Sequence, residues 1–315
     1  MTSNYDITIC SVYHSLEAKR LLELNYKFVK ICNPDVAIRW IVADNTPSGF
    51  LEKLNPQQFI VVPGAGEITG LLPWMWGSYR HARALKNTLP HITTRFVLFL
   101  DIDFYIVISS WMKIIPRYMQ DHGLAFFGVP WHPSHERKWR YFPSPHTLFV
   151  DLTMISRDTL NFEPVFGDML HPSLFMRARE YIRRNIIPFS LRRRLDISGY
   201  SDTGYPIYKT YAGKTAYECP QPVSTTIPTF LDRLLPDRFS LVPKRAGYTT
   251  RTCFRDLGYA DCVARGWEEF MWQEQPYGFH IRGSHKLQDN LEGNIMHIRT
   301  ILDEFIYKPI SHTSS

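Results

Sequence analysis

The first hundred residues alternate between short apolar runs and stretches with a helical period. The apolar runs predict four buried strands, at residues 7–12, 38–43, 59–62 and 95–100. Between them, residues 15–32 and 76–89 have the spacing of helices, the second ending before Pro90. Strands that alternate with helices are joined by right-handed crossovers and form a mainly parallel sheet. The alternation therefore predicts an α/β fold with helices flanking a central sheet.

The alternation of predicted strands and helices is less regular after the first hundred residues. Residues 124–129 and 147–155 predict two more strands, separated by a loop rich in aromatic and histidine residues that runs from Trp131 to His146. Aromatic side chains in such a loop stack on a sugar ring or pack against the core. A closing helix is expected near residues 294–305, so the C-terminal part is predicted to be helical and irregular.

Composition fits a globular protein with an anionic partner. The chain has 315 residues, 44% of them hydrophobic, which is enough for one large domain with an appended part. Its net charge of +6 suits a nucleotide, a nucleic acid or a lipid head group. Five scattered cysteines without a CxxC pair predict reduced thiols. With no apolar run of about 20 residues and no signal-peptide pattern, we expect a cytoplasmic protein.

Two carboxylates follow the fourth predicted strand, at Asp101 and Asp103. Asp44 follows the second strand, and the carboxyl ends of parallel strands meet at the edge of a sheet where ligands bind. Mg²⁺ and Mn²⁺ prefer oxygen ligands and favour sites shared with substrate phosphates. A pair with this spacing also arises by chance in a chain of this length, but its position at a strand end favours a metal site.

Three segments resemble, in order and spacing, the GT-A glycosyltransferases, family 2 in particular: residues 9–13 (ICSVY), 40–46 (WIVADNT) and 99–103 (FLDID). The resemblance implies a GT-A fold, which is Rossmann-like. It also implies that Asp101 and Asp103 bind the Mn²⁺ or Mg²⁺ that bridges the donor diphosphate. The nucleoside would contact Ser11, Val12, Tyr13 and Asp44, and the donor-contacting helix start would present Ser78, Arg80 and His81.

The same resemblance places a general base near residues 201–209, where Ser201 stands in place of the usual Glu. Asp202 is the base candidate and Asp196 the reserve. A long spacer, residues 161–199, precedes this position. The alternative is that Asp202 caps a turn, since Asp-Thr-Gly is good turn chemistry.

The tail resembles the HxxGxxK arrangement of several GT-A families, from His280 through Gly283 to Lys286. This resemblance implies that His280 or His285 is a third metal ligand and that Lys286 contacts the diphosphate. The plainer interpretation is a polar surface turn. We expect residues 1–240 to form the catalytic domain, with a basic insert at about 160–200, and residues 241–315 to complete the active site.

The basic stretch 177–194 has two interpretations. It is a solvated helical face, or it contacts an anionic membrane peripherally at the inner surface, because clustered arginines there lie beside Ile186, Ile187 and Phe189. No nucleic-acid partner is expected, since no recognised nucleic-acid-binding motif accompanies the charge.

Together these features predict a metal-dependent glycosyltransferase that moves a sugar from a nucleoside diphosphate donor to a hydroxyl of a glycan or lipid-linked saccharide. The family resemblance implies that the transfer inverts the anomeric configuration. Two alternatives stay open. A haloacid-dehalogenase-like phosphatase also places a DxD after an apolar strand, although here Tyr105 occupies a position where Thr or Val is usual. The second alternative is a catalytically degenerate protein that binds a nucleotide sugar without transferring it and acts as a scaffold.

Overall fold

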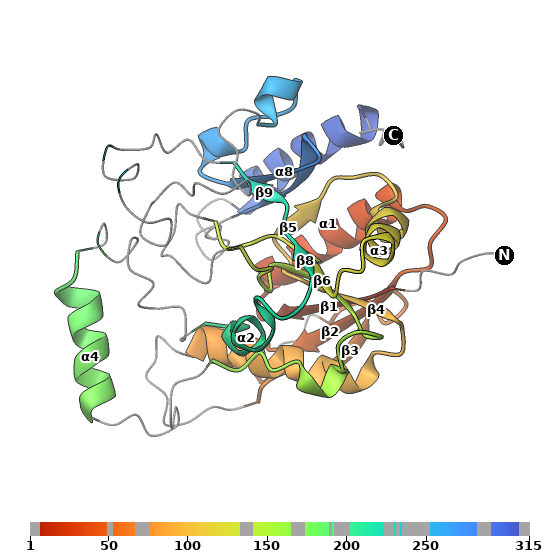
Figure 1. Cartoon of the computed structure of the whole chain (residues 1–315). Coiled ribbons are helices and arrows are strands. Elements are labelled where there is room, and N and C mark those ends of the chain that lie inside the picture. Colours follow the sequence, from red (N-terminus) through yellow and green to blue (C-terminus); the bar gives the residue numbers. More distant parts are fainter. Residues whose placement is uncertain are drawn as a thin grey trace.

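The computed structural model describes residues 7–48, 53–66, 76–132, 141–164, 174–188, 191, 202–223, 230, 234, 253–281 and 291–308. Within them, a seven-stranded sheet forms the centre of the molecule (Figure 1). Its strands lie in the order β3 (Ile60–Pro63), β2 (Arg39–Asp44), β1 (Ile7–Tyr13), β4 (Phe96–Leu100), β7 (Thr147–Asp151), β6 (Phe126–Gly128) and β8 (Tyr217–Glu218).

Most neighbours in this sheet are parallel. The exception is β7, which runs antiparallel to β4 on one side and to β6 on the other. The prediction of an α/β fold with a mainly parallel central sheet is confirmed. The predicted strand over 147–155 ends earlier, at Asp151, whose carboxylate accepts hydrogen bonds from the backbone and hydroxyl of Thr153 and so forms a turn.

Helices cover both faces of the sheet because each strand buries alternate residues on opposite sides. Helix α1 (Leu16–Cys32) begins at the N-cap Ser15 and packs with Ile7 and Ile9 of β1. On the other face, α2 (Trp76–Thr88) packs with Cys10 and Val12. Figure 1 shows the two helices on opposite sides of the sheet. Both helices were predicted from their apolar period.

Further helices are α3 (Trp111–Asp121), α4 (Leu174–Asn185), α6 (Tyr205–Tyr211) and α8 (Leu291–Tyr307). Short 3₁₀ turns lie at Leu89–His91, Arg157–Thr159, Arg255–Leu257 and Val263–Arg265. The expected closing helix is α8, which lies against α1, where Arg20 and Glu292 form a two-pronged ion pair. In the part of the chain that the structure describes, none of the helices is both long and apolar enough to cross a membrane.

A second sheet adds strands to the C-terminal part that the sequence did not indicate. Its order is β5 (Phe104–Ile106), β11 (Gln275–His280), β10 (Glu268–Trp272) and β9 (Gln221–Pro222), and all neighbours are antiparallel. Its strands come from both sides of the expected boundary at residue 240, so the two expected parts share this sheet. The chain passes from β4 of the first sheet to β5 of the second through residues 101–103.

Candidate active site

A cavity of about 400 Å³ opens where β1, β2 and β4 end. Its volume lies in the usual range for small-molecule sites. Residues that follow these strands line it together with the first turns of α2 and the end of β11: Val12, His14, Asn45, Gly77, Arg80, His81, Asp101, Ile102, Asp103 and His280. The predicted crevice at the carboxyl ends of the strands is therefore present, and it holds both carboxylates of the DxD pair.

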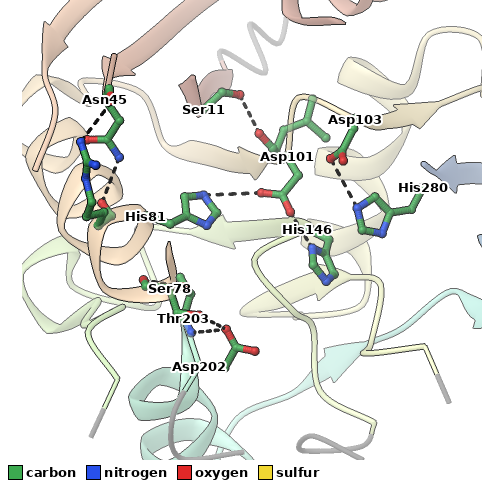
Figure 2. Close-up of polar contacts among 12 residues, drawn as sticks. Ser11, Asn45, Ser78, His81, Asp101, Asp103, His146, Asp202, Thr203 and His280 are labelled. Carbon is green, nitrogen blue, oxygen red and sulfur yellow. Dashed lines mark hydrogen bonds and ion pairs between the residues drawn. The ribbon is translucent and has the colours of Figure 1, made fainter. Parts of the chain in front are cut away.

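Asp101 is held by the strand beside it. Its backbone N–H donates to the carbonyl of His146, 3.0 Å away, which continues the β4–β7 ladder by one residue. The His146 Nδ1 atom lies 2.6 Å from Asp101 Oδ2, and His81 Nε2 lies 3.5 Å from Oδ1 (Figure 2). Burial alone would raise the pKa of Asp101, but the hydrogen bond from His146 and the nearby imidazoles hold it well below its usual range. Asp101 is therefore ionised at neutral pH.

Asp103 and His280 are brought together by the second sheet. The Ile281 N–H donates to the Asp103 carbonyl at 3.0 Å, at the end of the β5–β11 ladder. His280 Nε2 then lies 3.4 Å from Asp103 Oδ1, as Figure 2 shows. The Asp103 and His280 residues are 8% and 5% exposed, so this pair is largely withdrawn from solvent.

The other ring nitrogen of His280 faces a carboxylate. Glu268, directly across the β10–β11 ladder, places Oε2 2.9 Å from His280 Nδ1, and both side chains are buried. Burial alone would lower the pKa of His280, but the carboxylates of Asp103 and Glu268 raise it to about 10. Glu268 Oε1 also lies 3.8 Å from Nδ1 of His132, whose Nε2 donates to the Val223 carbonyl.

These residues fit a divalent metal. Asp101, His146 and His280 each offer a ligand atom, and the three atoms lie within 4.8 Å of one another. A metal-binding imidazole usually donates its second ring N–H to a carboxylate, which fixes its orientation. His280 has this arrangement, since Glu268 accepts from Nδ1 and leaves Nε2 facing Asp103. Ionised carboxylates beside such an imidazole are suitable ligands for Mn²⁺ and similar ions.

The residues of β1 that were expected to contact a nucleoside differ in whether they reach the cavity. Val12 lines the cavity, whereas Ser11 is fully buried: its Oγ donates to the Leu100 carbonyl at 2.6 Å and accepts from Trp40 Nε1 at 3.0 Å. The Ser11 side chain thus ties β1 to its neighbours and does not line the cavity. Tyr13 is also buried, and burial together with the Asp44 carboxylate raises its pKa.

At the end of β2, Asn45 lines the cavity, whereas Asp44, expected to contact the nucleoside, is not among the lining residues. The Asp44 carboxylate accepts from the Thr46 N–H at 2.9 Å and lies 3.9 Å from Lys53 Nζ. Asn45 accepts from the Ala65 N–H at 2.7 Å and donates to the Arg80 carbonyl at 3.2 Å. Asn45 therefore joins β2 to the first turns of α2, an arrangement that sequence analysis did not include.

The start of α2 carries Ser78, Arg80 and His81, as the sequence predicted for this segment. Arg80 and His81 line the cavity. Ser78 instead donates through Oγ to Asp202 Oδ1 at 3.0 Å, and its carbonyl accepts from the hydroxyl of Thr203 at 2.9 Å (Figure 2). The contact joins the first turn of α2 to the turn that precedes α6.

Asp202 lies beside the site and is not one of the residues that line the cavity. Its Oδ1 also accepts from the Thr203 N–H at 2.8 Å, so part of its role is that of a turn former. The reserve base Asp196 and the tail residues His285 and Lys286 lie outside the described residues. Their expected roles stay predictions, as does the role of Asp202 as a base.

Three residues near the candidate metal site were missed as ligands or supports: His146, Glu268 and His132. His146 was noted only as part of an aromatic loop, and its one signal was that it directly precedes a predicted strand. His132 was likewise noted only as part of that loop, and Glu268 gave no signal, because the partners of both come from strands distant in the sequence.

A comparison with models of known protein families found no match, and a comparison with curated proteins found none. Among solved structures, the galactosyltransferase LgtC in complex with donor and acceptor sugar analogs has 16% identity and a TM-score of 0.36, covering 67% of this chain and 72% of that one. The mannosyltransferase PcManGT from Pyrobaculum calidifontis, in complex with GDP-Man and Mn²⁺, has 13% identity and a TM-score of 0.34, covering 52% of this chain and 49% of that one.

A third solved structure, S. aureus TarS in complex with UDP, has 13% identity and a TM-score of 0.34, covering 50% of each chain. The match thus spans about half the length of the last two proteins. Identities and TM-scores this low assign neither a family nor an activity, so the function must be argued from the site itself.

Proposed function

We propose that this chain is a metal-dependent glycosyltransferase of the GT-A type, which transfers a sugar from a nucleoside diphosphate donor to an acceptor hydroxyl. The observation that carries the proposal is the position of Asp101 and Asp103. They open into a cavity of about 400 Å³ at the carboxyl ends of β1, β2 and β4, with His280 beside them. A nucleotide and its metal-bound diphosphate require such a site, with carboxylates for the metal and space beyond it.

In this proposal Asp101, Asp103 and His280 hold a divalent metal, Mn²⁺ or Mg²⁺. When bound, the metal supplies Lewis acidity that stabilises charge on the departing nucleoside diphosphate. Glu268 fixes the ring of His280 through Nδ1. The buried position of Asp103 and His280 keeps competing water away from these ligands.

Donor binding is assigned to the residues on the other side of the cavity. The first turn of α2 carries the partial positive charge of a helix N-terminus, and Arg80 adds a full charge, so this side suits the diphosphate. Arg80 is oriented by the hydrogen bond from its Nη2 to the Asn45 carbonyl, 3.2 Å away. Val12 and Asn45, which also line the cavity, would then contact the nucleoside.

The acceptor would be activated by Asp202. Asp101 and Asp103 are the only carboxylates among the described residues that line the cavity, and both are assigned to the metal. Asp202, linked to the start of α2 through Ser78, is the described carboxylate that the sequence resemblance assigns to the base position. It would take the proton from an acceptor hydroxyl as the oxygen attacks the anomeric carbon, with inversion.

A lipid-linked acceptor would agree with the exposed face of α4. Its apolar side chains Leu174, Phe175, Tyr181 and Ile182 are exposed, Leu174 to 84%, and Figure 1 shows α4 at the margin of the molecule, apart from both sheets. The sequence intersperses arginines among them. Such a helix suits peripheral contact with an anionic bilayer. Binding to vesicles with anionic lipid, and its loss in Phe175→Asp/Ile182→Asp, would test this contact.

The central proposal is tested by thermal unfolding with a panel of UDP-, GDP-, CDP- and dTDP-sugars, each with and without Mn²⁺. The wild type is compared with Asp101→Ala/Asp103→Ala and with a control, Asp35→Ala/Asp121→Ala, which removes two exposed carboxylates from other regions. A donor at about 100 times its Kd adds roughly 2.7 kcal/mol to the stability of the native state.

We expect one nucleotide class to raise the melting temperature of the wild type and control, only with Mn²⁺, and to leave the site variant unchanged. No shift with any donor would refute the proposal, and hydrolysis of a phosphomonoester would then favour the phosphatase. Donor binding without transfer to any acceptor would favour a scaffold protein.

A further inference from the structure

The carboxylates of the proposed metal site are surrounded by more imidazoles than the DxD pattern requires. His146 Nδ1 lies 2.6 Å from Asp101 Oδ2, and its ring centroid lies 4.5 Å from that of His280. One ligand atom from each of Asp101, His146 and His280 falls within the same 4.8 Å group. Figure 2 shows the rings of His146 and His280 side by side below the two aspartates.

His146 is held in this position by backbone and by packing. Its carbonyl accepts from the Asp101 N–H at 3.0 Å, so the two residues face each other across the ends of β4 and β7. Its ring packs edge-on against Trp131, with centroids 4.4 Å apart, and its side chain is 12% exposed. A side chain fixed in this way has lost most of its freedom before any ligand binds, which favours binding.

We infer that His146 is a fourth protein ligand of the metal, and that it makes the site selective for Mn²⁺, Co²⁺ or Zn²⁺ over Mg²⁺. The inference rests on the proposed function only in placing a divalent ion at Asp101 and Asp103. Imidazole nitrogen suits transition metals, whereas Mg²⁺ demands near-octahedral oxygen ligands and keeps several waters. Two carboxylates with two imidazoles therefore form a site in which Mg²⁺ binds poorly.

A merely structural His146 has a different signature. If its ring only orients Asp101 through their hydrogen bond, removing the ring disturbs a carboxylate ligand that all divalent ions share, and all lose affinity alike. If the ring is itself a ligand, its removal weakens the binding of Co²⁺ and Zn²⁺ far more than that of Mg²⁺. The ratio of affinities therefore separates the two roles.

The experiment measures metal binding to the full chain without nucleotide. Co²⁺ is followed by its visible absorption, and Mn²⁺, Zn²⁺ and Mg²⁺ by competition against it, on wild type, His146→Ala and His146→Gln. The Gln variant keeps a side-chain amide that can donate to Asp101 but removes the ring nitrogen. His122→Ala is the control, since His122 is an exposed histidine at the end of α3. Circular dichroism establishes that each variant is folded.

We expect both His146 variants to bind Co²⁺ at least about tenfold more weakly, with a changed absorption spectrum, and to lose far less affinity for Mg²⁺ than for Co²⁺. An equal loss for Co²⁺ and Mg²⁺, or no loss, would overturn the inference while leaving the proposed function standing. Conversely, selective Co²⁺ binding that depends on His146, combined with no response to any nucleotide sugar, would retain this inference and refute the glycosyltransferase. If no ion binds the folded wild type, both fail.

Discussion

Replacing Glu268 by Gln removes one negative charge from a pair that is closed to solvent and changes little else. Glu268 is 2% exposed, and its Oε2 accepts from His280 Nδ1 at 2.9 Å. A Gln side chain has nearly the same shape, and its amide oxygen can accept the same hydrogen bond. The variant therefore isolates what the charge contributes to holding His280 as a ligand.

The expected magnitude follows from the hydrogen bond. A hydrogen bond to a charged group contributes about 1.5–3 kcal/mol, against about 0.5–1.5 kcal/mol for a neutral one, so we expect a loss of stability on the order of 1–2 kcal/mol. Changing the group that orients a metal-binding imidazole typically lowers metal affinity by about 10–100-fold. Such a loss corresponds to about 1.4–2.8 kcal/mol in binding free energy.

The assay is calorimetric titration with Mn²⁺, and the matched control is Glu269→Gln. Glu269 is the next residue on β10, so its side chain points to the opposite face of the sheet. There it is also buried, and it accepts from the N–H groups of Phe254 and Cys262. We expect weaker Mn²⁺ binding in Glu268→Gln alone. Wild-type affinity in that variant, or an equal loss in the control, would refute the orienting role.

Three further predictions concern single positions. Burial raises the pKa of Glu269 from 4.5 to about 7. The contribution of Glu269 to stability, up to roughly 3 kcal/mol, is therefore fully present below pH 4.5 and is lost as the pH rises through 7. Urea unfolding should show a free energy of unfolding that falls over this pH range in the wild type and falls less in Glu269→Gln. Gly64→Ala would place a Cβ atom 2.2 Å from both the Asn45 Oδ1 and the Asp44 carbonyl oxygen. We therefore expect the free energy of unfolding to fall by about 1–3 kcal/mol and donor binding to weaken. An unchanged melting temperature would contradict this steric argument. Asp202→Asn should lower kcat by about 10²–10⁴-fold with little change in KM if Asp202 is the base, and should lower only the melting temperature if it serves the turn alone.

The first half of the fold was predictable because its signals are local. Each strand from β1 to β4 is a short, mainly apolar run, and α1 and α2 have a clear helical period. The crossover rule then orders these strands in parallel, which places Asp101 at the carboxyl edge together with the end of β2. The second sheet has no comparable signal. Its strands are as short as two or three residues, and β10 begins with two carboxylates.

The imidazoles and their supporting carboxylate depend on strand register, which a single sequence does not display. In β7, Leu148 and Val150 are buried on one face of the sheet and Phe149 on the other. A slip of one residue would exchange the faces on which these three side chains pack, so the packing of the two apolar layers fixes the register in which Leu100 lies opposite Thr147. Once that register is fixed, His146 must lie opposite Asp101. A slip in either direction would instead bring Pro145 or Thr147 there, and neither side chain offers a ring nitrogen. The packing that stabilises the sheet therefore also determines which side chain reaches the proposed metal site.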